Sequence, residues 1–136
     1  MELIMAILKV KCDCGMTVEA NVGDRMCNNK LHWFQSYYCN NCGNTSELDG
    51  VGNIPPDIET AIMEQEGRCG LFLNNSDDRQ KAEFLLKKRQ SDNLEKYKLF
   101  IEKKTDEILY GTKNEILLTE KYLKSKGGID CLIKYY

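Results

Sequence analysis

The sequence predicts an α+β protein: a small antiparallel ribbon of β-strands, followed by a β-α-α-β-α-β domain with a three-stranded sheet and three helices. Residues 4–48 are rich in β-forming side chains that alternate with polar ones and are interrupted by Asn, Gly and Asp. From residue 69 onward, short apolar runs alternate with longer segments of helical periodicity. The composition, 42% hydrophobic and 29% charged, is that of a globular chain.

The predicted division is a ribbon over residues 1–52, a linker with a short helix over residues 53–68, and a second domain over residues 69–136. Residues 49–53, Asp-Gly-Val-Gly-Asn, form a turn-rich joint after the ribbon. Pro55 and Pro56 favour the start of a helix that runs to Glu66, because proline is tolerated in a first turn, and Gly67 ends it.

The elements of the second domain follow in order. Strands are predicted at residues 69–73, 108–110 and 129–136, and helices at 78–90, 92–106 and from Thr112 to residue 126. Asp92 with Glu95, and Thr112 with Glu115, have the spacing of a capping box that opens a helix. Gly127-Gly128 is a helix-ending signal.

Composition excludes several classes of protein. The formal net charge is −2, so no strong field draws the whole chain toward nucleic acid or anionic membrane. No run approaches the roughly 18–20 apolar residues of a membrane span. Glu2 stands where a secretion signal carries a basic residue, which favours a strand in a cytoplasmic protein over a leader. Seven cysteines, an odd number, indicate thiols and metal in a reducing compartment.

Four cysteines form two tight pairs, each followed by glycine. They are Cys12 and Cys14, followed by Gly15, and Cys39 and Cys42, followed by Gly43, with 24 residues between the pairs. Zinc prefers four soft ligands in a tetrahedron, and two knuckles at strand ends can supply four thiolates. The sequence therefore predicts one structural Zn²⁺ per chain. The first pair is one residue shorter than the common Cys-x-x-Cys form, so Cys27 and His32 are the reserve ligands.

No catalytic residue is assigned. A four-cysteine site is closed to water and substrate, so its expected role is to stabilise the fold. His32 is the only histidine and is expected to be a packing residue. Cys69 and Cys131 lie in apolar strands and are expected to be buried, small side chains.

An aromatic strand offers the candidate surface for a partner protein. Period-two alternation places Trp33 and Tyr37 on one face of that strand, as apolar anchors for a protein contact. An acidic rim, in which Asp49 is the test position, is expected to steer a basic partner: Asp13, Glu19, Asp24, Glu47 and Asp49.

Residues 69–136 resemble the C-terminal domain of the bacterial ribosomal stalk protein. The matching features are residues 81–88 for the first helix, 93–95 opening the second, Gly111-Thr112 with residues 113–126 for the third, and 127–129 leading into the last strand. The stalk domain's factor-binding stretch is not reproduced at residues 90–94. The resemblance implies a protein-docking scaffold and not translation-factor binding. The N-terminal half is similar to zinc ribbons.

The whole chain is similar in style to bacterial immunity proteins that neutralise polymorphic or contact-dependent toxins. The expected function is thus a non-enzymatic protein–protein interaction, most plausibly the inhibition of a cognate toxin domain. The alternative is a nucleic-acid-binding zinc-ribbon regulator or a ribosome-associated adaptor. Residues 1–56 hold four basic and six acidic side chains, and residues 57–136 hold fifteen of each, so neither part is a basic module and nucleic acid is not the expected main ligand.

Overall fold

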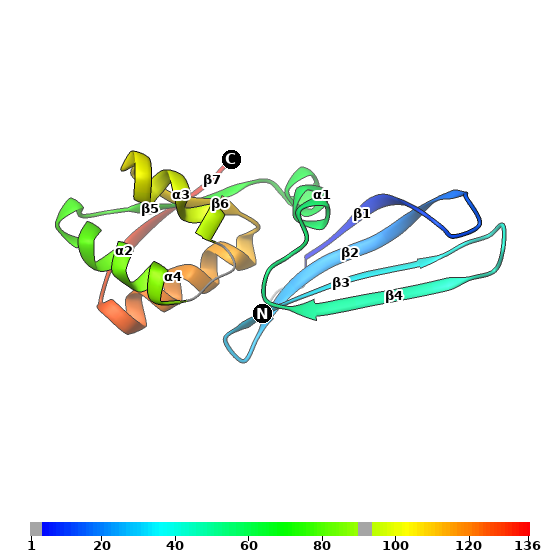
Figure 1. The fold of residues 1–136 in the computed structure, drawn as a ribbon, viewed down its shortest axis with the longest axis horizontal. Coiled ribbons are helices and arrows are strands. Elements are labelled where there is room, and N and C mark those ends of the chain that lie inside the picture. The colour runs from blue at the N-terminus through cyan, green and yellow to red at the C-terminus, as the bar shows by residue number, and fades with distance from the viewer. Residues whose placement is uncertain (1–3, 90–93) are drawn as a thin grey trace. The chain divides into compact units, whose positions relative to one another are not determined.

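A computed structural model describes residues 4–89 and 94–136. The chain divides into two compact units, Met1–Gly67 and Arg68–Tyr136, and the second begins one residue before the predicted domain. Both units mix sheet and helix, which confirms the α+β class (Figure 1).

The first unit is a four-stranded antiparallel meander with one helix. Its strands are β1 (Ile4–Lys11), β2 (Thr17–Cys27), β3 (Lys30–Tyr38) and β4 (Thr45–Val51), in the order β1-β2-β3-β4. Asn28 and Asn29 link β2 to β3 with positive φ angles of 53° and 62°, the geometry of a tight hairpin turn that asparagine tolerates.

This sheet is larger than the predicted ribbon. Asn21, Gly23 and Asp24 are of residue types that often interrupt strands, yet they lie inside β2, because that strand is paired on both sides, with β1 and with β3. Gly50 lies inside β4 and not in a joint. A Cβ at that position would lie 2.6 Å from the indole of Trp33, so the absence of a side chain lets the ring pack across β4.

Helix α1 (Pro56–Glu66) begins and ends where the sequence indicates, with proline in its first turn and Gly67 as its C-cap. It belongs to the first unit and is not a linker. Its residues Ile58, Ala61 and Ile62 are buried, and it contacts β1 and β2. The helix thereby covers the sheet face that carries Ala6 and Val22, which lie opposite each other in the register and are both buried.

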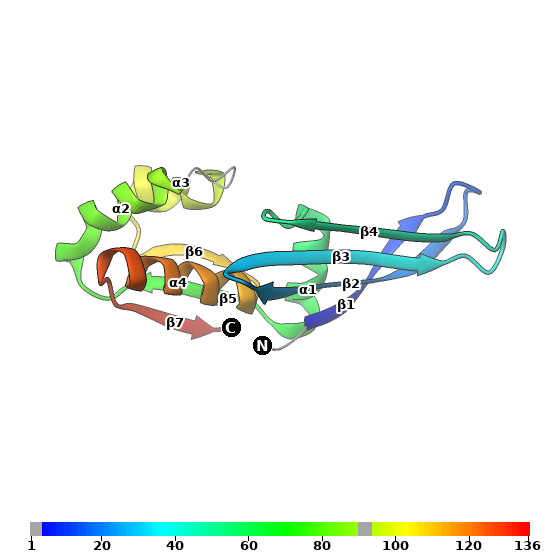
Figure 2. The same cartoon turned by 90° about the horizontal axis from the view of Figure 1, so that it is seen from below.

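The second unit has the predicted β-α-α-β-α-β order. Its elements are β5 (Cys69–Leu73), the short turn η1 (Ser76–Asp78), α2 (Arg79–Lys88), α3 (Leu94–Lys103), β6 (Glu107–Gly111), α4 (Lys113–Gly127) and β7 (Cys131–Tyr135). The sheet order is β6-β5-β7, and both pairings are antiparallel. Figure 2 shows the same strands and helices from below.

Capping is visible at α4. The N–H of Glu115 donates to Thr112 Oγ1 at 3.2 Å, and the N–H of Thr112 donates to Glu115 Oε1 at 3.0 Å. This confirms the capping box at Thr112, and Gly128 ends the helix in the left-handed conformation. The other capping box includes Asp92, which lies outside the described residues.

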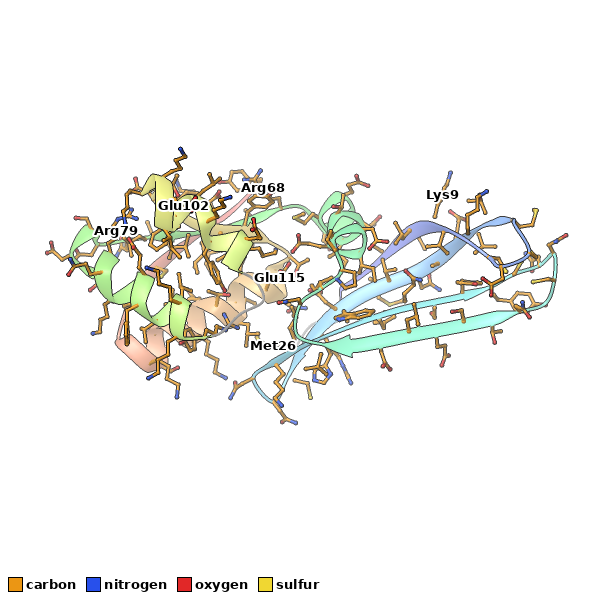
Figure 3. The ribbon with its side chains drawn as sticks, viewed as in Figure 1. Lys9, Met26, Arg68, Arg79, Glu102 and Glu115 are labelled. Carbon is orange, nitrogen blue, oxygen red and sulfur yellow. The ribbon has the colours of Figure 1, made fainter. Side chains whose placement is uncertain are left out.

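The core of the second unit joins the sheet to all three helices. It includes Leu71 of β5, Leu86 of α2, Phe100 of α3 and Ile116 of α4, each fully buried. Side chains of the unit are drawn in Figure 3, where Arg79 and Glu115 are labelled. The Arg79 guanidinium carbon lies 4.6 Å from the centre of the Phe100 ring, so Phe100 is enclosed by apolar and cationic groups.

Replacing Phe100 with Ala should lower the free energy of unfolding of the second unit by about 3–5 kcal/mol, because it leaves a cavity in a closed core. The neighbouring Leu99, 61% exposed on the same helix, is the matched control, and Leu99→Ala should cost about 0.5 kcal/mol or less. Urea unfolding followed by helical circular dichroism measures both. Equal losses in the two variants would show that this core is placed wrongly.

Candidate metal centre

The four paired cysteines lie at one end of the first unit's sheet. Connections in an antiparallel meander alternate between its two ends, so the β1–β2 and β3–β4 loops share an end, as Figure 1 and Figure 2 show. Cys12 directly follows β1 and Cys39 directly follows β3. The topology thus brings together two knuckles that are distant in sequence.

The sulfur atoms form a compact cluster. All four lie within 4.8 Å of one another, and two of the pairs, Cys12 with Cys42 and Cys14 with Cys39, are 3.5 and 3.6 Å apart. A tetrahedral ion with ligands at about 2.3 Å requires sulfurs about 3.8 Å apart. A disulfide requires about 2.05 Å, so these are free thiols spaced for a metal ion.

Glycine shapes both knuckles. Gly15 and Gly43 have φ angles of 95° and 76°, which residues with a Cβ rarely adopt. Each N–H turns back to the first cysteine of its knuckle: Gly15 donates to the Cys12 carbonyl at 2.9 Å, and Gly43 to the Cys39 carbonyl at 2.8 Å. This reversal points both sulfurs of a knuckle to the same side.

Polar hydrogens surround the sulfurs and favour the thiolate form of two of them. The backbone N–H of Cys14 lowers the pKa of Cys12. The side-chain amide of Asn41, whose Nδ2 is 3.5 Å from Cys14 Sγ, and the N–H of Met16 lower the pKa of Cys14 to about 6. Such hydrogen bonds orient metal ligands and tune their basicity.

The Cys42 thiol holds its proton more tightly than Cys12 and Cys14 hold theirs. The N–H of Asn44 lowers the pKa of Cys42, but burial and hydrogen bonds with the other three cysteines outweigh it and raise this pKa to about 12. Four thiolates this close repel one another, and a divalent cation at their centre relieves the repulsion. Both the geometry and the charge of the site therefore fit a metal ion.

Tyr37 is a neighbour of this site. Interaction with the Cys12 thiol, together with burial, raises the pKa of Tyr37. Tyr37 is the next-to-last residue of β3, which ends just before Cys39. Sequence reasoning missed Asn41, which lies inside the second knuckle and binds across to the first.

The predicted partner surface is not one surface. In the β3–β4 register Trp33 lies opposite Gly50, whereas Asp49 lies opposite Phe34. Neighbouring residues of a strand point to opposite faces, so Trp33 and Tyr37 share the face that α1 covers in part, and Asp49 lies on the other. Asp24 is 0% exposed and cannot belong to an acidic rim.

The reserve ligands lie at the wrong end of the sheet. Cys27 pairs with Lys30 next to the β2–β3 turn, and His32 pairs with Arg25 close by. Within residues 4–89 and 94–136, no other group of three or more His, Cys, Asp and Glu side chains converges as the four cysteines do. The structure therefore keeps the predicted ligand set.

Two more cysteines belong to the second unit. Burial raises the pKa of Cys69, and it raises the pKa of Cys131 to about 11, with nearby carboxylates adding to the effect. A nucleophilic thiol needs a lowered pKa. Both residues therefore resemble packing side chains, and Cys69 is part of the buried core.

No protein-family model, curated protein or solved structure matches the chain. Among the helices that the structure describes, none combines the length and apolar character needed to cross a membrane.

The metal centre predicts different results for two cysteine variants. Wild-type protein, purified and dialysed against metal-free buffer, should carry about one metal ion per chain, and Cys39→Ser should lose it, because three thiolates hold the ion far more weakly than four. Cys27→Ser, outside the cluster, is the control and should keep full occupancy. Elemental analysis by mass spectrometry gives the ratio. Full occupancy in the Cys39 variant would rule out this ligand set.

Proposed function

We propose that the chain is a non-enzymatic zinc protein in which the ion stabilises the first unit and the protein acts by binding another protein. The observation that carries the proposal is the closed four-sulfur cluster. Thiolate ligands in a tetrahedron favour Zn²⁺ or iron among biological metals, and with four protein ligands no position is left for substrate. Such an ion contributes folding free energy and not catalysis.

The first unit has reason to need this ion. Only one helix covers its sheet, so most of the buried apolar side chains lie on one face, among them Ala6, Val22, Ile58 and Ile62. A small unit with a core of this kind gains stability from a metal. The ion would tie the β1–β2 loop to the β3–β4 loop and so join the two hairpins that form the edges of the meander.

Zinc removal should unfold the first unit and spare the second, since the ligands all lie in the first unit. Trp33 is the only tryptophan, so its fluorescence reports on the first unit, and helical circular dichroism reports mainly on α2, α3 and α4. A tight chelator should shift the fluorescence transition to lower temperature and leave most of the helical signal. Identical melting with and without chelator would contradict a structural ion. A strongly coloured protein that contains iron would contradict zinc alone.

The charge of the first unit supports a basic protein as the partner. Residues 1–67 hold 4 Lys and Arg against 10 Asp and Glu, a formal net charge of −6. Opposite charge speeds association and orients the partners. The first unit also has a hollow lined by Arg25, His32, Trp33, Phe34, Asp49, Gly50 and Val51, where the acidic Asp49 lies among aromatic and apolar side chains and one arginine. Among basic proteins, the partner that we propose is a toxin domain with a basic cleft.

The immunity proposal is tested by locating the coding sequence of this chain, cloning any toxin domain encoded beside it, and expressing that domain with and without the chain. Growth should be rescued only when the chain is present. Asp49→Lys should slow association several-fold and weaken its salt dependence, measured by stopped-flow with the purified toxin domain. The control is Asp130→Lys, the same charge change in the second unit, which should leave the rate unchanged. Equal cell death with and without the chain would remove the immunity role.

A further inference from the structure

The second unit has one sheet face that its helices do not cover. Leu71 and Leu109 are cross-strand partners on the inner face and belong to the core. The residues that alternate with the core residues along each strand point outward. On this outer face Gly70 pairs with Tyr110 of β6 and with Lys134 of β7. The apolar side chains of this outer face are Phe72, Tyr110, Leu132 and Tyr136.

Phe72 of β5, Tyr110 of β6 and Tyr136, which directly follows β7, supply the aromatic rings, and a cation lies over each of them. The Arg68 guanidinium carbon, labelled by residue in Figure 3, lies 3.8 Å from the centre of the Tyr110 ring and 5.0 Å from that of Tyr136. Lys134 Nζ lies 4.5 Å from the centre of the Phe72 ring. The N–H of Tyr136 donates to the Arg68 carbonyl at 2.8 Å, which ties this ring to the end of the sheet.

Gly70 leaves room in the middle of the face for side chains from other positions, which bury it. A Cβ there would lie 2.9 Å from Phe72 Cε1 and 2.6 Å from Glu107 Oε2, so these side chains reach across the central strand. Glu107 is the acidic group on the face. Its carboxylate is 3.5 Å from Arg68 Nη2 and accepts a hydrogen bond from the Tyr136 hydroxyl at 3.2 Å. Neighbouring strands of a sheet lie about 4.8 Å apart. Aromatic rings on such strands form a platform on which bases can stack.

The charge of this unit differs from that of the first. Residues 68–136 hold 15 Lys and Arg against 11 Asp and Glu, a formal net charge of +4. The sequence division at residue 56 conceals this difference, because it assigns the four acids of α1 to the second part: Asp57, Glu59, Glu64 and Glu66. Aromatic rings with interleaved cations on a positively charged unit suit a ligand that is both planar and anionic.

We propose that this outer face binds single-stranded nucleic acid. Bases displace the cations from the ring faces and stack on Tyr110, Tyr136 and Phe72, and the released Arg68 and Lys134 contact the backbone phosphates. Stacking needs no particular base, so the binding has little sequence preference. The rings lie on the surface of a sheet and not on a helix that could enter a groove of a duplex. Duplexes therefore bind more weakly than single strands. The proposal is independent of the first unit's partner.

The test uses the 136-residue chain loaded with zinc, and fluorescein-labelled 12-nucleotide oligo-U and oligo-dT. Fluorescence anisotropy should give a Kd of about 1–100 µM at physiological salt. Tyr110→Ala and Tyr136→Ala should each weaken binding about tenfold, because each removes a stacking surface. Lys134→Gln should reduce the slope of log K against log salt by about 1. Oligo-U and oligo-dT are titrated in separate experiments. The proposal is supported if either one binds and the substitutions weaken that binding as stated.

Tyr135→Ala is the matched control. Tyr135 is 64% exposed against 63% for Tyr136, but it lies on the opposite side of β7, so its loss should change the Kd less than twofold. Circular dichroism should show that every variant is folded. The proposal is overturned if neither oligonucleotide binds at 100 µM protein in low salt. It is also overturned if Tyr135→Ala weakens binding as much as Tyr136→Ala, if a duplex binds equally well, or if only a poly-glutamate peptide binds.

Discussion

The convergence of four cysteine sulfurs is the constraint on which the first unit depends. Each knuckle closes one hairpin of the meander, and only the strand order places the two side by side. Four thiolates this close repel one another, so the charged cluster is stable only with a cation or with protons. Asn41 extends the arrangement outward, because its side-chain amide donates a hydrogen bond to Cys14 Sγ.

The two units solve the problem of a small core differently. The second buries large side chains from three helices against three strands, including Tyr97, Phe100 and Leu86. A salt bridge of 2.8 Å between Lys96 and the buried capping residue Glu115 also joins α3 to α4. The first unit covers its sheet with one helix, α1, and has the four-cysteine cluster in place of a larger apolar core. Their opposite charges, −6 and +4, suit different ligands, a basic protein and a nucleic acid strand.

Local signals made the cysteine site predictable. A knuckle needs only a few consecutive residues and a glycine, so spacing alone identified Cys12, Cys14, Cys39 and Cys42. The Thr112–Glu115 capping box and the order of elements in the second unit follow from equally local patterns. The extent of the first unit's sheet, which is larger than the predicted ribbon, does not follow from local patterns. Gly50 resembles a turn residue in sequence, but it lies in a strand because the Trp33 ring on the neighbouring strand occupies the space above it.

Cross-strand register also decided which surfaces exist. Trp33 and Asp49 face opposite sides of the sheet, and no feature within either strand states how the two strands align. The helix α1 was predicted at the right residues, yet its place on the first sheet depends on burial of Ile58 and Ile62 against distant strands. That placement moves four acidic residues between units and reveals the charge difference that the sequence division hides.

The ligand set of the ion can be measured by zinc K-edge X-ray absorption on the purified protein. Four cysteine ligands give a single shell of four sulfur atoms at about 2.3 Å, with no nitrogen or oxygen ligand. A mixed shell of sulfur with nitrogen or oxygen would contradict this ligand set, since it would mean that one of the four cysteines does not bind the ion and that the site has an open or substituted position.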